Sequence, residues 1–412
     1  MELWQPLTQH AMAPPPPVIV RAEGAYLYTA DGRKIFDGIS SWWVTTHGHS
    51  HLAIRAAIAV QAEKLSQTIL ANFMHDAVNN CISELGQVVD EKFAYTFLSD
   101  SGSTANEVAL KMAVGAWHHR GQPQRYKIIT FDHSYHGATL GATSLGARGV
   151  FSRPHEALLF EVLRVPSPAV DAAACLDSLK KIFAAHKNEI AAVIIEPLIQ
   201  GAGGMKFYAP EILDEITRIA RAKGAFVIFD EVMTGFGRTG MMFAYQQCKE
   251  LPDIITLAKG ITGGFLPMGA TLASAEIFDT FYAQDKSRML FHSTSYSGNA
   301  LACAAVAANL KVWRDENTNA KLSAINAYHQ KFLPRLKVHN PRICGTIAAF
   351  EIEGTNNNYL ANIGQDLQEF CLTRGVLLRP MGNTMYIMPP YCTREPDLEN
   401  CYDMLAEFLA SH

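Results

Sequence analysis

The sequence predicts an α/β fold, with a large domain around a mostly parallel sheet and a smaller α+β domain after it. From about residue 95 to residue 273, short apolar runs alternate with longer helical stretches. The runs are unbroken rather than alternately apolar and polar, which is typical of strands buried on both faces. Strands and helices in alternation form parallel sheets. After residue 300 the order of elements changes, which indicates a second domain.

The elements follow from these patterns in chain order. Strands are predicted at residues 95–98, 127–131, 191–196, 225–230, 254–257 and 269–273. Helices are predicted between them at residues 104–120, 172–187 and 210–223. The second domain is expected to contain an Ala-rich helix at 300–314, a strand at 343–352, a helix at 363–374 and a last helix from Pro396.

The N-terminal region is predicted to be extended. Residues 14–17 are four prolines, which favour an extended arm. Residues 25–36 alternate in polarity and break at Asp31-Gly32, which predicts a hairpin. Because 412 residues exceed one simple core, we expect an N-terminal segment (1–50) that packs with a small domain (300–412), and a large domain (51–299).

Composition excludes several classes of protein. Hydrophobic residues make up 49% of the chain and charged residues 18%, which is typical of a folded globular protein. The net charge is −4 without long charged blocks, so nucleic acid is not an expected partner. No apolar run is long enough for a membrane span, and no secretory signal is found. Eight scattered cysteines without a C-x-x-C pair favour reduced thiols and a cytoplasmic location.

Ligands of α/β sheets collect where the strands end, so the residues after each strand are the candidates for a site. Small residues at 99–104 precede a helix and could bind an anion, or could be an ordinary N-cap. Tyr135, next to Gly137, could stack on a flat ligand, or could belong to a packed loop. Asp230 ends an apolar strand and needs a positive partner, either a pyridinium nitrogen or an arginine.

Lys259 completes the set. It ends a buried strand in a Gly-rich turn, where a desolvated amine becomes a nucleophile towards aldehydes, unless it is a surface lysine. An anion site, a stacking aromatic, a buried carboxylate and an amine are together what pyridoxal phosphate needs. The residues therefore predict an enzyme that uses this cofactor.

At these residues the sequence resembles the fold-type-I, class III aminotransferases. Segment 229–240 resembles the hallmark of that class, and Lys259 follows Asp230 at its spacing of 29 residues. Within the class, the chain is most similar to the branch that acts in biotin synthesis. The segments that carry this likeness are 40–43, 196–205, 378–382 and 388–391.

The resemblance implies a seven-stranded, mostly parallel sheet, a homodimer with shared active sites, and a role for each matching residue. Lys259 would form the Schiff base, Asp230 would bind the ring nitrogen, and Tyr135 and Val232 would cover the two ring faces. The other implied residues are Gly102 and Ser103 for the phosphate, Ser295 for the partner's phosphate, Arg379 for a substrate carboxylate, and Trp42, Trp43, Arg238 and Ser293 for the substrates.

The resemblance also implies a reaction. The amino group would pass from S-adenosylmethionine to 7-keto-8-aminopelargonate, or alternatively from lysine to the same keto acid. Another ω-amino acid or diamine remains open as substrate, because the chain departs from the branch at three positions. Leu7 stands where an aromatic is usual, Ala138 where Asp is common, and Ser293 where Gly is usual.

Three other interpretations were considered. Residues 235–240 fit the dinucleotide pattern G-x-G-x-x-G, but Asp230-Glu231 lies where its tight turn should begin, and a dehydrogenase needs no strand-end lysine. His47, His49 and His51 could bind a metal, but no Asp, Glu or Cys stands close in sequence, so no metal is expected. A non-catalytic binding protein would not need Asp230 and Lys259 together.

Overall fold

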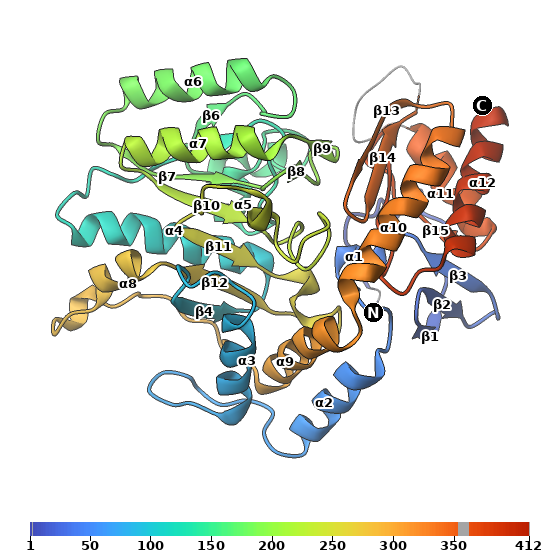
Figure 1. Cartoon of the computed structure of the whole chain (residues 1–412), viewed down its shortest axis with the longest axis horizontal. Helices are drawn as coiled ribbons and strands as arrows, with labels where there is room; N and C mark the ends of the chain where they lie inside the picture. Colours follow the sequence, from blue (N-terminus) through green and yellow to red (C-terminus); the bar gives the residue numbers. More distant parts are fainter. Residues whose placement is uncertain (2, 353–361, 412) are drawn as a thin grey trace.

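A computed structural model describes residues 1, 3–352 and 362–411, and its centre is one seven-stranded sheet (Figure 1). β12 is antiparallel to both of its neighbours, and the other strands are parallel. The α/β prediction and the mostly parallel sheet are therefore confirmed. In spatial order the strands are β4 (Tyr95–Ser99), β12 (Gly269–Ala273), β11 (Ile254–Leu257), β10 (Phe226–Asp230), β7 (Ile190–Ile195), β5 (Lys127–Phe131) and β6 (Leu163–Val165).

Helices cover both faces of this sheet because successive residues of its strands point to opposite sides. Ile194 and Ile228 pack in one core with α4, whereas Val193 and Val227 pack in the other core with α6 and α7. The strand β6 was not predicted, because it has three residues and includes Arg164. The helices around the sheet are α4 (Gly102–His119), α5 (Leu140–Leu145), α6 (Ala172–Ala185), α7 (Pro210–Ala222) and α8 (Ala275–Phe281).

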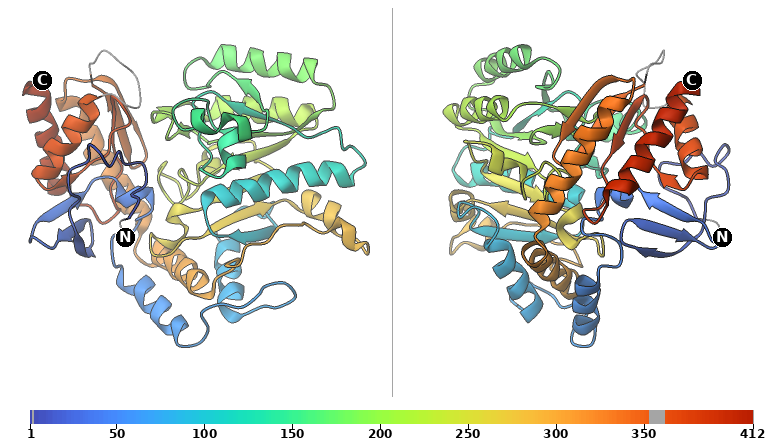
Figure 2. Two further views of the ribbon diagram at one scale, coloured as in Figure 1. Left: turned by 180° about the vertical axis from the view of Figure 1, so that it is seen from behind. Right: turned by 45° about the vertical axis from the view of Figure 1, so that its right-hand side comes forward.

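The two ends of the chain meet beside the large sheet. β15 (Val376–Leu377) pairs in parallel with β3, so the N-terminal strands and a C-terminal strand share one sheet. Both views in Figure 2 show the N-terminal strands beside the C-terminal helices. The hairpin predicted at residues 25–36 is confirmed as β2 and β3. The elements are β1 (Ile19–Glu23), β2 (Tyr26–Thr29), β3 (Lys34–Asp37), α1 (Ser40–Trp43), α11 (Asn362–Thr373) and α12 (Glu395–Ser411).

A second antiparallel sheet contains β13 (His339–Cys344), β14 (Ile347–Glu351) and β16 (Thr384–Ile387). The single strand predicted at residues 343–352 is wrong. The chain turns at Gly345, whose positive φ of 56° favours glycine, and a Cβ there would lie 2.2 Å from the main-chain nitrogen of Gly240. This close approach joins the sheet to the loop after β10.

The helices α2 (Leu52–Ala62), α3 (Asp76–Gly86) and α9 (Ala300–Asp315) lie below the large sheet in Figure 1. α9 packs against α2 and α3, and α10 (Thr318–Phe332) follows it. The predicted division of the chain into domains stays a prediction, because α9 begins the proposed small domain but packs on helices of the proposed large one. Among the helices that the structure describes, none is both long and apolar enough to cross a bilayer.

Candidate active site

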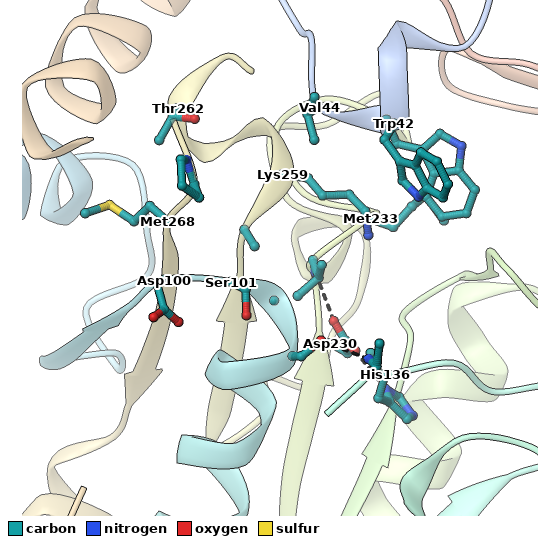
Figure 3. Close-up of a pocket in the computed structure, with 18 of the residues that line it drawn as sticks. Trp42, Val44, Asp100, Ser101, His136, Asp230, Met233, Lys259, Thr262 and Met268 are labelled. Carbon is teal, nitrogen blue, oxygen red and sulfur yellow. Dashed lines mark hydrogen bonds and ion pairs between the residues drawn. The ribbon is translucent and has the colours of Figure 1, made fainter. Parts of the chain in front are cut away.

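A cavity of about 450 Å³ lies at the carboxyl ends of β10, β11 and β4, where the sequence placed its candidates (Figure 3). It adjoins a larger cavity of about 950 Å³, and Lys259, Trp42, Trp43 and Tyr135 line both. Among the predicted residues in the smaller cavity, Trp42 and Lys259 lie furthest apart in sequence, by 217 positions. The predicted residues in the smaller cavity are Trp42, Trp43, Gly102, Ser103, Tyr135, Asp230, Val232 and Lys259.

One end of the cavity is the N-terminus of α4. Ser101 caps this helix in a reciprocal capping box: its Oγ accepts the N–H of Thr104 at 3.1 Å, and its own N–H donates to Oγ1 of Thr104 at 3.0 Å. The N–H groups of Gly102 and Ser103 in the first turn have no acceptor within the helix. A Cβ at Gly102 would lie 2.5 Å from Val232, so glycine keeps this approach open. The segment is thus an N-cap that also offers main-chain donors to an anion.

Asp230 is buried at the end of β10 and is held by an asparagine, a histidine and a main-chain N–H rather than by an arginine. Its Oδ2 accepts Nδ2 of Asn106 at 2.8 Å and lies 2.7 Å from Nδ1 of His136 (Figure 3). Its Oδ1 accepts the N–H of Val232 at 3.0 Å. The arginine partner that the sequence left open is absent among the described residues. Sequence reasoning missed Asn106 and His136, although an asparagine on the apolar face of α4 was a usable signal.

Lys259 follows β11 at the start of a 3₁₀ helix, Lys259–Thr262, and its side chain extends into the cavity (Figure 3). Its φ is 45°, a left-handed conformation that costs energy for a residue with a side chain. Burial lowers the pKa of the amine. The negative charges of Asp230 and Glu196 raise it, but the effect of burial is larger. Among the described residues, no hydrogen bond or ion pair is made by Nζ, which lies 5.1 Å from the Trp43 ring centre. Lys259 is therefore no ordinary surface lysine.

The cavity wall includes Glu196, to which the sequence analysis gave no role. Glu196 follows β7 and is buried, and its Oε1 accepts the N–H of Tyr135 at 3.0 Å. Burial raises the pKa of Glu196 to about 7, while the charge of His136 lowers it and that of Asp230 raises it. A carboxylate directly after a buried strand is the same signal that identified Asp230.

Arg379, which is predicted to bind a substrate carboxylate, lines the larger cavity. The guanidinium carbon of Arg379 lies 4.3 Å from the Trp42 ring centre, and no carboxylate among the described residues pairs with it. The Trp43 ring nitrogen donates to the Tyr386 hydroxyl at 2.9 Å. Leu7 and Ala138, the first two departures from the branch, also line this cavity. The arrangement offers apolar surface with one cation at its edge.

Three predicted residues lie outside both cavities. Arg238 is buried, and its guanidinium donates to main-chain oxygens of Trp43, Thr45 and Pro389 at 3.1–3.2 Å, so the geometry does not support direct substrate contact. Ser293 and Ser295 are exposed, and the main-chain oxygen of Ser295 accepts Nε2 of Gln67 at 3.1 Å. A single chain does not bring these serines to its own site.

The structure also bears on the two alternative motifs. His49 contacts Asp37 and His51 contacts Glu316, at 2.8 and 2.9 Å, although no acid is close in sequence. Over the described part of the chain, no three metal-binding side chains form a group. Residues 235–240 open no α-helix, since a short 3₁₀ helix at Ala244–Gln247 comes next. The helix that a dinucleotide motif requires is thus missing there.

Comparison with known proteins agrees with this site. Residues 8–409 match the family model of the class-III aminotransferases, and the chain belongs to that family. It is 44% identical to the adenosylmethionine-8-amino-7-oxononanoate aminotransferase of Synechococcus elongatus, over 99% of this chain and 98% of the relative. The crystal structure of the same-named enzyme from Methanocaldococcus jannaschii has a TM-score of 0.95 and 31% identity, covering 99% and 97% of the two chains. An amine transaminase from an uncultivated Pseudomonas species, solved in its PLP-bound form, has a TM-score of 0.89 and 29% identity, covering 100% and 98%.

Proposed function

We propose that this chain is a pyridoxal-phosphate-dependent aminotransferase of biotin synthesis. It would transfer the amino group of S-adenosylmethionine to 8-amino-7-oxononanoate, which is also called 7-keto-8-aminopelargonate. The observation that carries the proposal is the meeting of Lys259, Asp230 and the α4 N-terminus in one cavity. The same-named relatives, at up to 44% identity over nearly the whole chain, support the choice of reaction.

The residues present fit the cofactor. The first turn of α4 offers two main-chain donors where a Cβ at Gly102 would press on Val232, which suits a phosphate. Asp230 supplies a buried carboxylate for a ring nitrogen, and the amine of Lys259 has no competing partner among the described residues. When bound, pyridoxal phosphate supplies an aldehyde that bonds reversibly to amines and a protonated ring that withdraws electrons.

Each residue then has a physical task. Asn106 and Val232 donate hydrogen bonds to the carboxylate of Asp230, which would keep the ring nitrogen protonated. Lys259 would hold the cofactor through its amine and would move a proton at the donor carbon. The lowered pKa of Lys259 increases the fraction of neutral amine that can act as a base. The donor, once it has given up its amino group, would leave before the acceptor enters, which is a ping-pong scheme.

The acceptor would lie in the larger cavity. Its apolar chain would contact Trp42, Trp43 and Met381, and its carboxylate would bind Arg379 through two parallel hydrogen bonds. The donor is the less constrained partner, because Leu7 and Ala138 stand in this cavity where an aromatic residue and an aspartate are usual in the branch. Lysine is the second candidate donor, and another ω-amino acid or diamine is the third.

The proposed enzyme is a homodimer with shared sites. Ser295 would reach the phosphate in the partner subunit, because it is exposed and outside its own cavity. Large apolar side chains are exposed near it, both on residues 67–75, which contact residues 295–299 through Gln67 and His75, and on residues 291–296. These are Ile69, Phe73, Met74, Phe291 and Tyr296, each at least 59% exposed, and we call them the apolar patch. Such a patch is expected at a protein interface. A cytoplasmic location stays a prediction.

One assay tests the reaction. Each candidate donor is mixed with the yellow enzyme, and the loss of cofactor absorbance is followed before and after the keto acid is added. S-adenosylmethionine should discharge the absorbance, and the keto acid should restore it. If no donor gives a change that the keto acid reverses, the chain remains an aminotransferase but the proposed substrates are wrong.

A further inference from the structure

Glu196 joins two loops of the cavity through both of its carboxylate oxygens. Oε1 accepts the N–H of Tyr135 at 3.0 Å, and Oε2 accepts the N–H of Gly201 at 2.9 Å. The side chain is 5% exposed, so these two donors replace the water that a carboxylate needs. Tyr135 belongs to the loop after β5, and Gly201 belongs to the turn between β8 (Ile199–Gln200) and β9 (Lys206–Phe207).

The two loops are in direct contact elsewhere as well. Nε2 of Gln200 donates to the main-chain oxygen of Asp132 at 2.8 Å. A Cβ at Gly203 would lie 1.9 Å from the main-chain oxygen of His133, so the two backbones touch. His133 and Leu198 have positive φ values of 63° and 65°, conformations that persist only when surrounding contacts hold them. Glu196 is the charged member of these contacts, and it lines the cavity.

We propose that Glu196 is a positioning residue, whose carboxylate holds the Tyr135 loop against the Gly201 turn and so sets one wall of the cofactor site. This inference rests on the proposed function, because Tyr135 matters only if a flat ring binds beside it. Glutamine at this position has the same shape but presents an amide N–H₂ to one of the two main-chain donors. One loop would then lose its acceptor.

The ionisation of Glu196 bears on the strength of this contact. The titratable groups that face it are His136, Asp230, Lys259 and Tyr208. Burial raises the pKa of Glu196 to about 7, with the charge of Asp230 adding to the effect and that of His136 opposing it. Above that pH both oxygens of the ionised group accept freely, and below it the added proton weakens one of them. The advantage of glutamate over glutamine should therefore grow as the pH rises through 7.

The test measures cofactor binding rather than turnover. Pyridoxal phosphate is titrated into the apo-protein, and binding is followed by quenching of the fluorescence of Trp42 and Trp43, which line the cavity. Glu196→Gln should weaken binding at least tenfold at pH 8 and less at pH 6, since an unpaired buried donor is costly. The control is Glu231→Gln. Glu231 is also a buried carboxylate that accepts two main-chain N–H groups, but it lines neither cavity. Glu231→Gln should change the affinity less than threefold.

A double-mutant cycle separates positioning from general destabilisation. If Glu196 acts through Tyr135, then Glu196→Gln should change the affinity less than twofold when Tyr135→Ala is already present. Additive effects, equal losses in both glutamine variants, or unchanged affinity in Glu196→Gln would each overturn the proposal.

If the wild-type protein does not bind pyridoxal phosphate, the proposed function fails instead. Should Glu196→Gln not fold, Glu196→Asp, which draws the carboxylate back by one methylene, takes its place with the same expected outcomes.

Discussion

Side chains from three other parts of the chain hold Asp230 in position. Asn106 lies in α4, His136 follows β5, and Thr256 lies in β11, and Thr256 in turn donates to Oδ1 of Asn106 at 2.8 Å. Asn106 also donates to the main-chain oxygen of His136 at 2.8 Å, so these groups are linked to one another as well as to Asp230. The residue proposed to polarise the cofactor is thus part of a network that holds it at the floor of the cavity.

Replacement of Asp230 by Asn should leave the fold intact and lower the turnover about 100-fold or more, because the ring nitrogen loses the charge that keeps it protonated. Single-turnover kinetics with a saturating donor measures the effect. Asp214→Asn is the matched control: Asp214 is buried and accepts two main-chain N–H groups, but it lies outside both cavities. Near-normal turnover in Asp230→Asn would mean that this carboxylate is structural.

Lys259 should carry the cofactor covalently. Reduction of the yellow holoenzyme with borohydride should fix the label to Lys259, because its amine is desolvated and has no partner among the described residues. Peptide mapping by mass spectrometry locates the label. Lys206 is the useful comparison, since it lines the larger cavity yet follows no buried strand. A label on Lys206, or on any other lysine, would contradict the assignment.

Glu231 should make stability depend on pH. Burial raises its pKa to about 7 in the folded protein, above the ordinary value of 4.5. Between these pH values the folded chain keeps a proton that the unfolded chain releases. The free energy of unfolding therefore falls as the pH rises, and the decrease is complete above about pH 7. The loss is about 3 kcal/mol. Between pH 4.5 and 7.5 the free energy of unfolding, measured with urea, should therefore fall by about 3 kcal/mol more in the wild type than in Glu231→Gln, and curves that stay parallel would contradict the prediction.

At the scale of elements, the start of α4 shows how packing overrides helix propensity. Alanine in place of Gly102 would ordinarily stabilise a helix by about 1 kcal/mol. A Cβ there would lie 2.5 Å from Cγ1 of Val232 and 3.4 Å from Ala258, so these groups would have to move. The glycine therefore reflects the approach of β10 and β11 to the helix N-terminus rather than any local preference.

Gly102→Ala should weaken pyridoxal phosphate binding about tenfold, because it pushes Val232 into the space where the ring lies. Titration of the apo-protein followed by fluorescence measures this change. Gly86→Ala is the control, since Gly86 ends α3 and a Cβ there meets nothing within 4 Å. That variant should bind the cofactor like the wild type. Equal affinity in both variants would mean that Val232 yields without affecting the ring site.

At the scale of the whole molecule, the apolar patch and Ser295 lie outside both cavities. A site that needs Ser295 is complete only when two chains meet. This geometry makes the oligomeric state part of the proposed mechanism, because separation of the subunits would remove a phosphate contact from each site.

The protein should be a homodimer in dilute solution, and Phe291→Glu should raise its dissociation constant at least 100-fold by placing a charge in the apolar patch. Sedimentation velocity measures both. Val170→Glu serves as the control, since Val170 is 63% exposed but precedes α6, far from α2 and α3 in Figure 1. A fully active monomer would remove Ser295 from the site and contradict the shared-site proposal.

The sequence by itself determined the fold class and the cofactor chemistry. Unbroken apolar runs identified six strands of the large sheet, and Asp230 and Lys259 could be found because each follows such a run directly. These are local signals: burial on both faces leaves a pattern within a few residues. The turn at Gly345 was missed because its cause is the main chain of Gly240, more than a hundred positions away.

Only the tertiary structure decided which side chains complete the site. Asn106 and His136 reach Asp230, Glu196 reaches Tyr135, and Arg238 is turned away from the cavity by main-chain carbonyls. These contacts join residues tens to hundreds of positions apart, and a polar side chain's local sequence does not show which distant group will satisfy it. The physical reason is that buried polar groups are paired wherever the packed chain happens to bring them together. Local patterns therefore indicate where chemistry lies, whereas packing selects the partners that tune it.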